Sequence, residues 1–320
     1  MATGSPTLAV LLDEWLDERQ SDRGLSANTE AAYRNDARVL AELIAGPGEV
    51  PALARLTAAD LTAGTIRGAL ADLARAGRAP STRNRVRSTI GAWCRWLVRR
   101  GLLESDPTVE IERPTQPRRL PVALTDSQLA AVLAAASTAD PGARAPWPAR
   151  DRALLATLVG AGLRASELCG LNVQDLTADP DPVLRVRGKG DKDRVVPLPP
   201  EVAKVIADYL PTRAERAAST TDPALFLGSR GRRLGRRALD HIVTNWFTRA
   251  GVPQTPGEAA HAFRHTYAVG LVANGAALPA VQELLGHANL ATTSIYLRAS
   301  AAHLHQTVAA LPVRSLLTND

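Results

Sequence analysis

The sequence predicts a mainly helical protein of two domains that carries one small β-hairpin. A chain of 320 residues is long enough for two domains of ordinary size. Residues 112–121 hold three prolines, which interrupt helix and sheet hydrogen bonding, between flanking segments with a helical pattern. Two β-branched runs, VLRVR at 183–187 and DRVVPL at 193–198, flank the turn GKGDK, as is typical of a hairpin. We therefore expect a helical domain over 1–111, a linker over 112–121, a second domain over 122–300 and a C-terminal tail over 301–320.

The first domain is expected to be entirely helical, because apolar residues recur at helical spacing along four segments. Ser26 or Asn28 is suited to cap the second helix. The fourth helix carries Trp93, Trp96 and Leu97 on one stripe, which we interpret as core rather than as a platform for stacking bases. The four expected helices are Leu8–Glu18, Ser26–Ile44, Ala58–Ala76 and Ser81–Arg100.

The second domain is expected to place helices around the hairpin. Thr125 is suited to cap a helix that runs to Ala136, and the segment 137–149 has the composition of a loop. Two further helices are expected over Arg150–Gly160 and Ser166–Leu171, and the pattern is again helical from Ala203 onward.

Composition excludes several classes of protein. With 45% hydrophobic residues the chain can form real cores, so a disordered or fibrous protein is not expected. No apolar run reaches the ~18 residues of a membrane-spanning helix, and the N-terminus lacks the basic start of a signal peptide. Cys94 and Cys169 are far apart, which argues against a disulfide framework or a zinc ribbon. We expect a reduced, cytoplasmic protein without a membrane partner.

The distribution of basic residues favours a polyanionic partner. The chain has 38 Lys+Arg against 32 Asp+Glu, a net charge of +6, and two segments, 81–100 and 228–239, contain arginines but no acid. Arginine forks match the geometry of phosphate oxygens, so these segments are candidates for binding a DNA backbone. The candidate DNA-contacting residues are Arg83, Arg85, Arg87, Arg230, Arg232, Arg233, Arg236 and Arg237.

Familiar nucleotide, metal and hydrolase motifs are missing. The sequence has no GxxxxGK[ST] loop, no HExxH and no GxSxG. His261 and His265 are four residues apart, a spacing that can bind metal, but no cysteine or acid close in sequence completes a site. We therefore expect neither a metal nor a cofactor.

A scattered set of polar residues fits a metal-free reaction on a phosphodiester. Two guanidiniums can neutralise the nonbridging oxygens as charge develops there. Histidines can donate to those oxygens or move the proton of the nucleophile, and a tyrosine can attack phosphorus to form a phosphotyrosine ester. Arg164 and Glu167 are three residues apart, and so are His261 and Arg264, so each pair shares a helix face. The candidate residues are Arg164, Glu167, Lys189, His261, Arg264, His287 and Tyr296.

The proton donor and the nucleophile each have rivals. Three lysines stand among the 38 basic residues, at positions 189, 192 and 204. A lysine can shift its pKa and release a proton, which an arginine does not do, so Lys189 in the hairpin turn suits the donor role and Lys192 is its rival. The rival nucleophiles are Tyr33, Tyr209 and Tyr267.

The motifs GLRASEL, RGKGDKDRVVPL, HAFRHTYAVGLVANG and VQELLGHANLATTSIYL, in this order, resemble those of the tyrosine recombinases, or phage-type integrases, and of their Xer-like branch most. The resemblance implies a helical N-terminal core-binding (SAM-like) domain and an α+β catalytic domain that close around DNA like a C. It implies Arg164 and Arg264 as the phosphate-binding pair and Glu167 as the acid that orients the site.

The same resemblance implies roles for the remaining catalytic candidates. His261 and His287 would serve as acid–base and hydrogen-bonding groups, and Lys189 would protonate the leaving 5′-oxygen. Tyr296 would form the 3′-phosphotyrosyl link. In the family, four subunits assemble on two duplexes and exchange strands through a Holliday junction, and each C-terminal segment, here 301–320, docks on a neighbour.

The function expected from the resemblance is site-specific recombination by a bacterial, nucleoid-associated enzyme, of the Xer type that resolves chromosome dimers. An integrase or excisionase of a phage or mobile element is the alternative. A type IB-like topoisomerase and a catalytically inert DNA-binding protein are less favoured. The resemblance leaves open whether a second recombinase or an accessory activator takes part.

Overall fold

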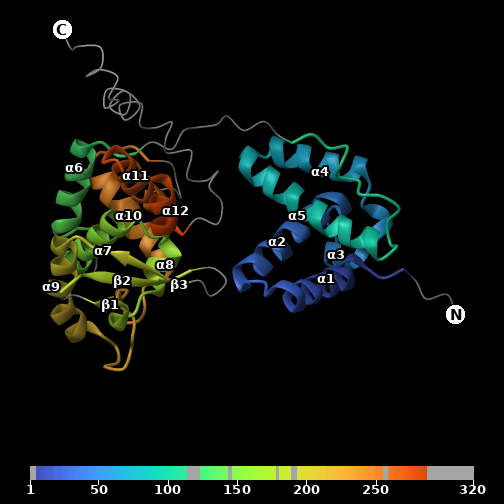
Figure 1. The fold of residues 1–320 in the computed structure, drawn as a ribbon. Helices are drawn as coiled ribbons and strands as arrows, with labels where there is room; N and C mark the ends of the chain where they lie inside the picture. Colours follow the sequence, from blue (N-terminus) through green and yellow to red (C-terminus); the bar gives the residue numbers. More distant parts are fainter. Residues whose placement is uncertain are drawn as a thin grey trace, which may run out of the picture. The chain divides into compact units, whose positions relative to one another are not determined.

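The chain folds into two compact units, residues 1–118 and 119–320. The computed structural model describes residues 5–113, 123–142, 146–177, 180–188, 193–254 and 259–286, coloured in Figure 1. The division between the units falls between Arg118 and Arg119, inside the proline-rich stretch 112–121.

The first unit is helical, as its apolar periodicity predicts. Ser26 accepts a hydrogen bond from the backbone N–H of Thr29, so the predicted cap of the second helix is confirmed. The helix expected over Ala58–Ala76 is wrong in one respect, because Thr62 breaks it by capping a new helix through a reciprocal pair of hydrogen bonds with Thr65. The elements are α1 (Leu8–Arg23), α2 (Ala27–Ala45), α3 (Ala52–Arg55), the 3-10 helix η1 (Ala58–Asp60), α4 (Ala63–Arg75) and α5 (Pro80–Arg99).

Aromatic side chains form the centre of this unit's core. Trp93 and Trp96 are each 1% exposed, which confirms the interpretation of the tryptophan stripe as core. The ring of Trp15 stacks on those of Tyr33 and Trp93, with centroid separations of 5.1 and 6.1 Å. Tyr33 is therefore a packing residue of the first unit.

The second unit surrounds a small sheet with helices. Thr125 caps its first helix in a reciprocal pair with Gln128, as predicted. The strands form an antiparallel sheet in the order β1-β2-β3. The elements are α6 (Asp126–Ser137), α7 (Pro148–Ala161), α8 (Ala165–Gly170), the 3-10 helix η2 (Val173–Asp175), β1 (Leu176–Thr177), β2 (Val183–Arg187), β3 (Asp193–Pro197), α9 (Pro200–Arg216), α10 (Arg236–Arg249), α11 (Ala259–Ala273) and α12 (Leu278–Leu285).

Two features of this unit differ from the sequence prediction. The two-residue strand β1 was not expected, because two residues carry no readable alternation. The stretch between α9 and α10 is not helical, although the pattern predicted helix throughout. Residues Ala224–Leu227 instead run through the core fully buried, and Leu227 pairs with Arg233 across a glycine-containing turn.

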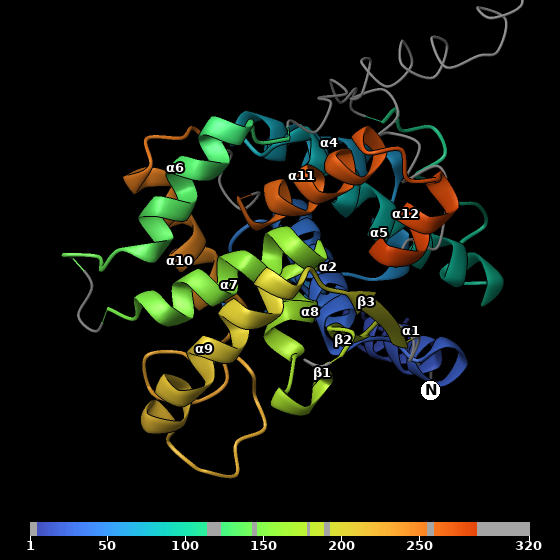
Figure 2. The same ribbon diagram turned by 60° about the vertical axis from the view of Figure 1, so that its left-hand side comes forward.

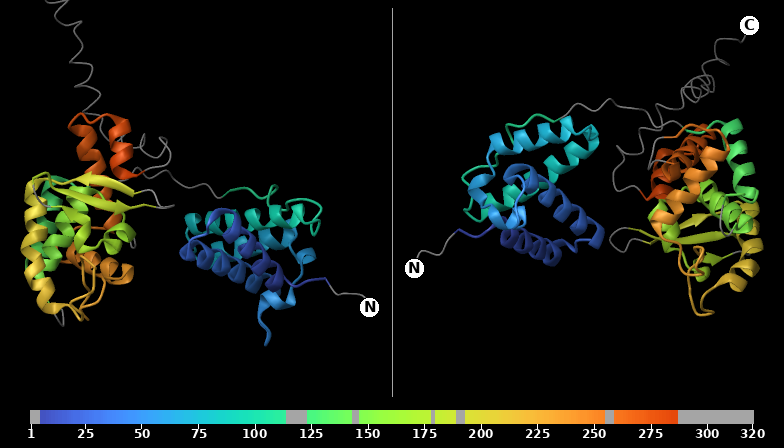
Figure 3. Two further views of the ribbon diagram at one scale, coloured as in Figure 1. Left: turned by 60° about the horizontal axis from the view of Figure 1, so that its bottom comes forward. Right: turned by 180° about the vertical axis from the view of Figure 1, so that it is seen from behind.

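The last two described helices share a small apolar cluster beside the main core. Ala268 and Val272 of α11 pack with Val281 and Leu285 of α12 in a separate apolar cluster. α12 contacts α11 and β3, and it lies beside the hairpin in Figure 2 and Figure 3. Among the helices that the structure describes, none is both long and apolar enough to cross a bilayer.

Candidate active site

Arg164 and Glu167 form the predicted pair at the start of α8. Arg164 is the N-cap residue, and the carboxylate of Glu167 accepts from its backbone N–H at 2.8 Å and from its Nη1 at 2.7 Å. An acid at the third position of a helix commonly reaches back to the N-cap in this way. The three-residue spacing therefore brings the two side chains into contact through local helix geometry alone.

Glu167 gathers two further guanidiniums from distant parts of the chain. Nη1 and Nη2 of Arg194 donate to its two carboxylate oxygens, each at 2.9 Å, and Nη1 of Arg264 lies 3.8 Å from Oε2. Burial raises the pKa of Glu167, but the hydrogen bonds from Arg194 and Arg164 outweigh it, so the pKa lies below its ordinary value. The carboxylate is ionised, and the cluster keeps an excess of positive charge.

The same guanidiniums hold the C-terminal end of α12. Nε of Arg194 donates to the carbonyl of Leu284 at 2.8 Å, Nη2 of Arg264 donates to Leu285, and Nη2 of Arg164 donates to Gly286 at 3.1 Å. Carbonyls at the end of a helix lack partners within the helix, and the helix dipole favours cations there. Three consecutive carbonyls of the described chain are thus bound by three arginines that also surround one carboxylate.

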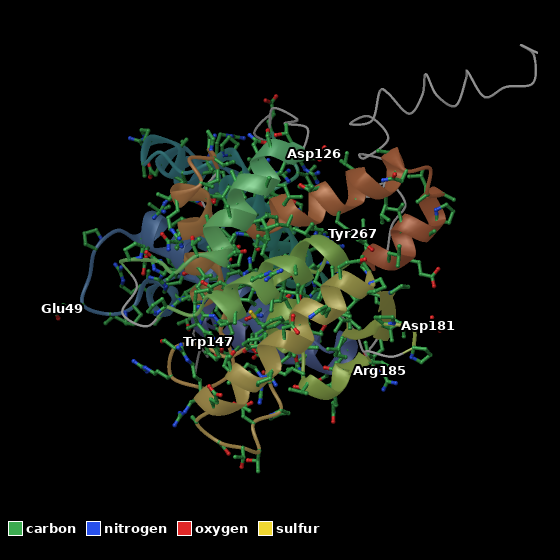
Figure 4. The ribbon with its side chains drawn as sticks, turned by 90° about the vertical axis from the view of Figure 1, so that its left-hand side faces the viewer. Glu49, Asp126, Trp147, Asp181, Arg185 and Tyr267 are labelled. Carbon is green, nitrogen blue, oxygen red and sulfur yellow. The ribbon has the colours of Figure 1, made fainter. Side chains whose placement is uncertain are left out.

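Arg264 is the most enclosed of the three. Its side chain is 1% exposed, and Nη1 donates to the carbonyl of Gly162 at 2.8 Å. Gly162 ends α7 with a φ of +58°, and a Cβ there would overlap the ring of Tyr267, which lies on α11 in Figure 4. Burial raises the pKa of Tyr267, offset in part by the nearby charges of Arg194 and Arg264. The ring packs against the turn that supports Arg264.

A cavity of about 1190 Å³ opens in front of this cluster. Arg164, whose side chain is 40% exposed, reaches it, whereas Arg264 is not among its described lining residues. The described wall includes Arg164, Ser166, Glu167, Arg187, Arg194 and Gly286. Its cations come from the start of α8 and from the hairpin: Arg164, Arg187 and Arg194. Four acids also line it: Glu167, Asp175, Asp193 and Glu283.

His261 stands in the first turn of α11 and is exposed. Its ring and that of His265 meet edge to face with centroids 4.4 Å apart. Among the described residues, no group of three or more His, Cys, Asp or Glu side chains could hold a metal ion.

Arg194 was not predicted from the sequence. In the hairpin Val186 pairs with Arg194 and Leu184 with Val196, so Arg194 shares the inward face with buried valine and leucine. Val195 points outward and is 57% exposed. In the sequence DRVVPL, Arg194 stands two residues before a valine, so it would lie on the inward face if that valine were buried. The run has two adjacent valines, however, and the sequence alone does not reveal which one faces inward.

Several predicted residues lie outside the described part of the chain: Lys189, its rival Lys192, His287, Tyr296 and the tail 301–320.

Of the rival nucleophiles, Tyr209 is fully buried between Trp147 and Phe226, and burial raises its pKa to about 12. An inaccessible phenol with a high pKa is poorly suited to attack a phosphate.

The candidate DNA-contacting arginines fall into three groups. Arg87 donates to the carbonyls of Ile111 and Thr108, and Arg233 donates to Cys169, Leu171 and Asn172. These two arginines hold the local fold. Arg83 is half-buried, Arg85 forms an ion pair with Asp36, and Arg236 forms an ion pair with Asp240. The remaining members are exposed: Arg230, Arg232 and Arg237.

Comparison with known proteins agrees with this architecture. The phage integrase family model matches residues 123–303, and the model of the phage integrase N-terminal SAM-like domain matches residues 12–101. Tyrosine recombinase XerC of Mycobacterium bovis (strain BCG / Pasteur 1173P2) is 39% identical over 300 residues, covering 93% of this chain and 96% of the relative. XerC of Mycobacterium sp. (strain JLS) is 37% identical over 289 residues, covering 88% and 92%.

Solved structures share the fold at lower identity. XerH site-specific recombinase bound to palindromic difH substrate has a TM-score of 0.70 at 20% identity, covering 93% of this chain and 83% of that chain. The Tn1549 transposon integrase in complex with transposon right end DNA has a TM-score of 0.69 at 19% identity, covering 95% and 100%. The chain belongs to the phage integrase family and is a tyrosine recombinase of the Xer type.

Proposed function

We propose that this protein cuts and rejoins DNA strands at a specific site through a 3′-phosphotyrosine intermediate and a Holliday junction, in the resolution of chromosome dimers. The observation that carries the proposal is the arginine cluster on Glu167, which presents Arg164 to a cavity that Arg187 and Arg194 also line. Three guanidiniums surround this one carboxylate, and the resulting local excess of positive charge is complementary to a DNA phosphate whose negative charge increases in the transition state.

The described residues divide the work between contact and support. Arg164 is held by Glu167 and Gly286 yet 40% exposed, so it can offer N–H groups to a nonbridging oxygen. Arg264 adds positive charge from within the fold and fixes the turn at Gly162. The ionised Glu167 keeps both guanidiniums oriented, which reduces the reorganisation that catalysis requires.

The reaction uses residues of this chain alone. The phenol oxygen of Tyr296 attacks phosphorus, the bond from phosphorus to the 5′-oxygen breaks, and Lys189 supplies the proton that the 5′-oxygen takes up. His261 and His287 accept the phenol proton and hydrogen-bond the phosphate. Attack by a 5′-hydroxyl on the phosphotyrosine reverses these steps, so strand joining needs no external energy source.

The partner is double-stranded DNA, with four recombinase subunits on two duplexes in the bacterial cytoplasm at the nucleoid. The exposed arginines of the 228–239 segment and of α5 are suited to the DNA backbone. Curated relatives named XerC, matched over 92% to 96% of their length, favour the Xer type over an integrase. The likeness to a transposon integrase at 19% identity concerns the fold alone.

The proposal is tested with a nicked suicide substrate that traps the covalent adduct. Wild-type protein is expected to form a protein–DNA adduct, whereas Tyr296→Phe is expected to bind DNA with unchanged affinity and form none, because the attacking oxygen is missing. A phenylalanine variant that is still trapped would move the nucleophile to Tyr33, Tyr209 or Tyr267.

Exchange between two dimer-resolution sites supports the Xer role, and exchange between attachment sites supports the integrase alternative. Relaxation of supercoils by a monomer indicates a topoisomerase.

A further inference from the structure

Arg194 connects three elements that meet at the cavity. From β3 it binds both carboxylate oxygens of Glu167 on α8 and the carbonyl of Leu284 on α12. Its side chain is 10% exposed, so these bonds are largely shielded from water. Buried, charge-assisted hydrogen bonds of this kind are strong and directional.

The end of α12 depends on such bonds for its position. The buried apolar residues of α12, Val281 and Leu285, pack with α11 in a satellite cluster, and its partly buried Leu284 packs against the main core of the unit. Its connection to the sheet runs through β3, where Arg194 donates to Leu284. Gly286 then ends the helix with a φ of +62°, and a Cβ there would lie 2.9 Å from Nη1 of Arg194. The guanidinium therefore occupies the space that this glycine leaves open.

We propose that Arg194 is a positioning residue for DNA cleavage: it sets the orientation of Arg164 through Glu167, and it fixes the C-terminal end of α12 through Leu284. The inference rests on the proposed function, since the reaction it affects is the attack on the DNA phosphate. Arg194 is assigned this indirect role because its three described hydrogen bonds go to Glu167 and Leu284.

The chemistry of the contacts requires an arginine. Two N–H groups of the fork meet the two oxygens of Glu167 while Nε meets the carbonyl of Leu284. A lysine has a single ammonium centre and cannot span three acceptors in this plane. Arg194→Lys is therefore expected to preserve the charge and lose the function.

The experiment measures single-turnover cleavage of the nicked suicide substrate at saturating DNA, together with DNA affinity and thermal stability. Arg194→Ala is expected to lower the cleavage rate about 100-fold, the usual effect of misplacing a catalytic group by about 1 Å, with less than about a threefold change in affinity. Arg194→Lys should behave likewise, and added methylguanidinium should restore part of the rate of Arg194→Ala but not of Arg194→Lys.

Arg150 provides a matched control in the same unit. It is also buried, and it also binds an acid and a carbonyl, those of Asp151 and Leu227, but it does not line this cavity. Arg150→Ala should lower the melting temperature and leave the cleavage rate of the folded protein unchanged. Arg194→Gln retains one amide donor and most of the volume, so it provides a folded variant if the alanine variant does not fold.

The outcomes separate the two proposals. No adduct with wild-type protein would overturn the proposed function and this inference with it. An adduct with wild-type protein, together with a wild-type rate for Arg194→Ala or Arg194→Gln, would overturn the positioning role alone. Full activity of Arg194→Lys, or equal rate losses in the Arg150 and Arg194 variants, would also overturn it, because charge or stability would then account for the effect.

Discussion

Asp36 in the first unit and Glu167 in the second are both buried acids that face arginines, yet their pKa values shift in opposite directions. Burial raises the pKa of Asp36, and the hydrogen bond from Thr89 and the charge of Arg85 offset this only in part. Nη1 of Arg85 lies 2.6 Å from Oδ1 of Asp36 in an ion pair, which lowers this pKa without outweighing burial.

Glu167 differs in the number of its donors. It accepts from the backbone and side chain of Arg164 and from both fork nitrogens of Arg194. These bonds more than compensate the cost of burial, and the pKa falls. The comparison shows that one arginine and one hydroxyl do not outweigh the effect of burial on the pKa of a buried acid, whereas several donors from two arginines do.

The largest expected effect is that of removing the charge at Glu167. Glu167→Gln leaves the guanidiniums of Arg164, Arg194 and Arg264 close together without a compensating charge. Breaking a buried ion pair from one side costs about 3 kcal/mol or more, so urea unfolding should show the second unit less stable by about that amount. An unchanged free energy of unfolding would contradict the role given to the hydrogen-bonded carboxylate.

How far the sequence predicts this site depends on how local each contact is. The Arg164–Glu167 pair and the cap at Thr125 involve residues three apart, so spacing alone predicts them. The bond from Arg194 to Leu284 spans 90 residues and that from Arg164 to Gly286 spans 122, and no local pattern contains them.

The fold shows the same division. Helices with an apolar face were predicted to within a few residues, because their periodicity and capping residues are local. The break before α4 was missed because apolar residues continue at helical spacing across it, while the hydroxyl of Thr62 captures the backbone N–H of Thr65. The buried path of Ala224–Leu227 was missed because a short apolar run suits a helix as well as an extended core segment.

A smaller effect is expected on the pH dependence of the second unit. The pKa of Glu167 is lower in the folded state than its ordinary value of 4.5. Its contribution to stability is therefore complete above about pH 4.5 and is lost as the pH falls through the folded value. Hydrogen exchange measured by peptide should show peptides of α8 and β3 losing protection in this range. Glu167→Gln should flatten that loss, and a steep loss retained in the variant would assign it to other carboxylates.

The smallest effect, and the one with the opposite sign, is expected at Asp36. Because its pKa is raised above the ordinary 3.8 in the folded state, folding favours the protonated form. That contribution is present below the unfolded value and is lost as the pH rises through the folded value, so the ionised carboxylate weakens the first unit at neutral pH.

Asp36→Asn keeps an oxygen that can accept from Thr89 and removes the charge. It should stabilise the first unit by less than about 1 kcal/mol at pH 7, and the gain should shrink toward pH 3. Peptide-resolved hydrogen exchange of α2 and α5 measures this gain. A loss of stability comparable to that of Glu167→Gln would mean that the ion pair with Arg85 sustains Asp36 as strongly as the arginine cluster sustains Glu167.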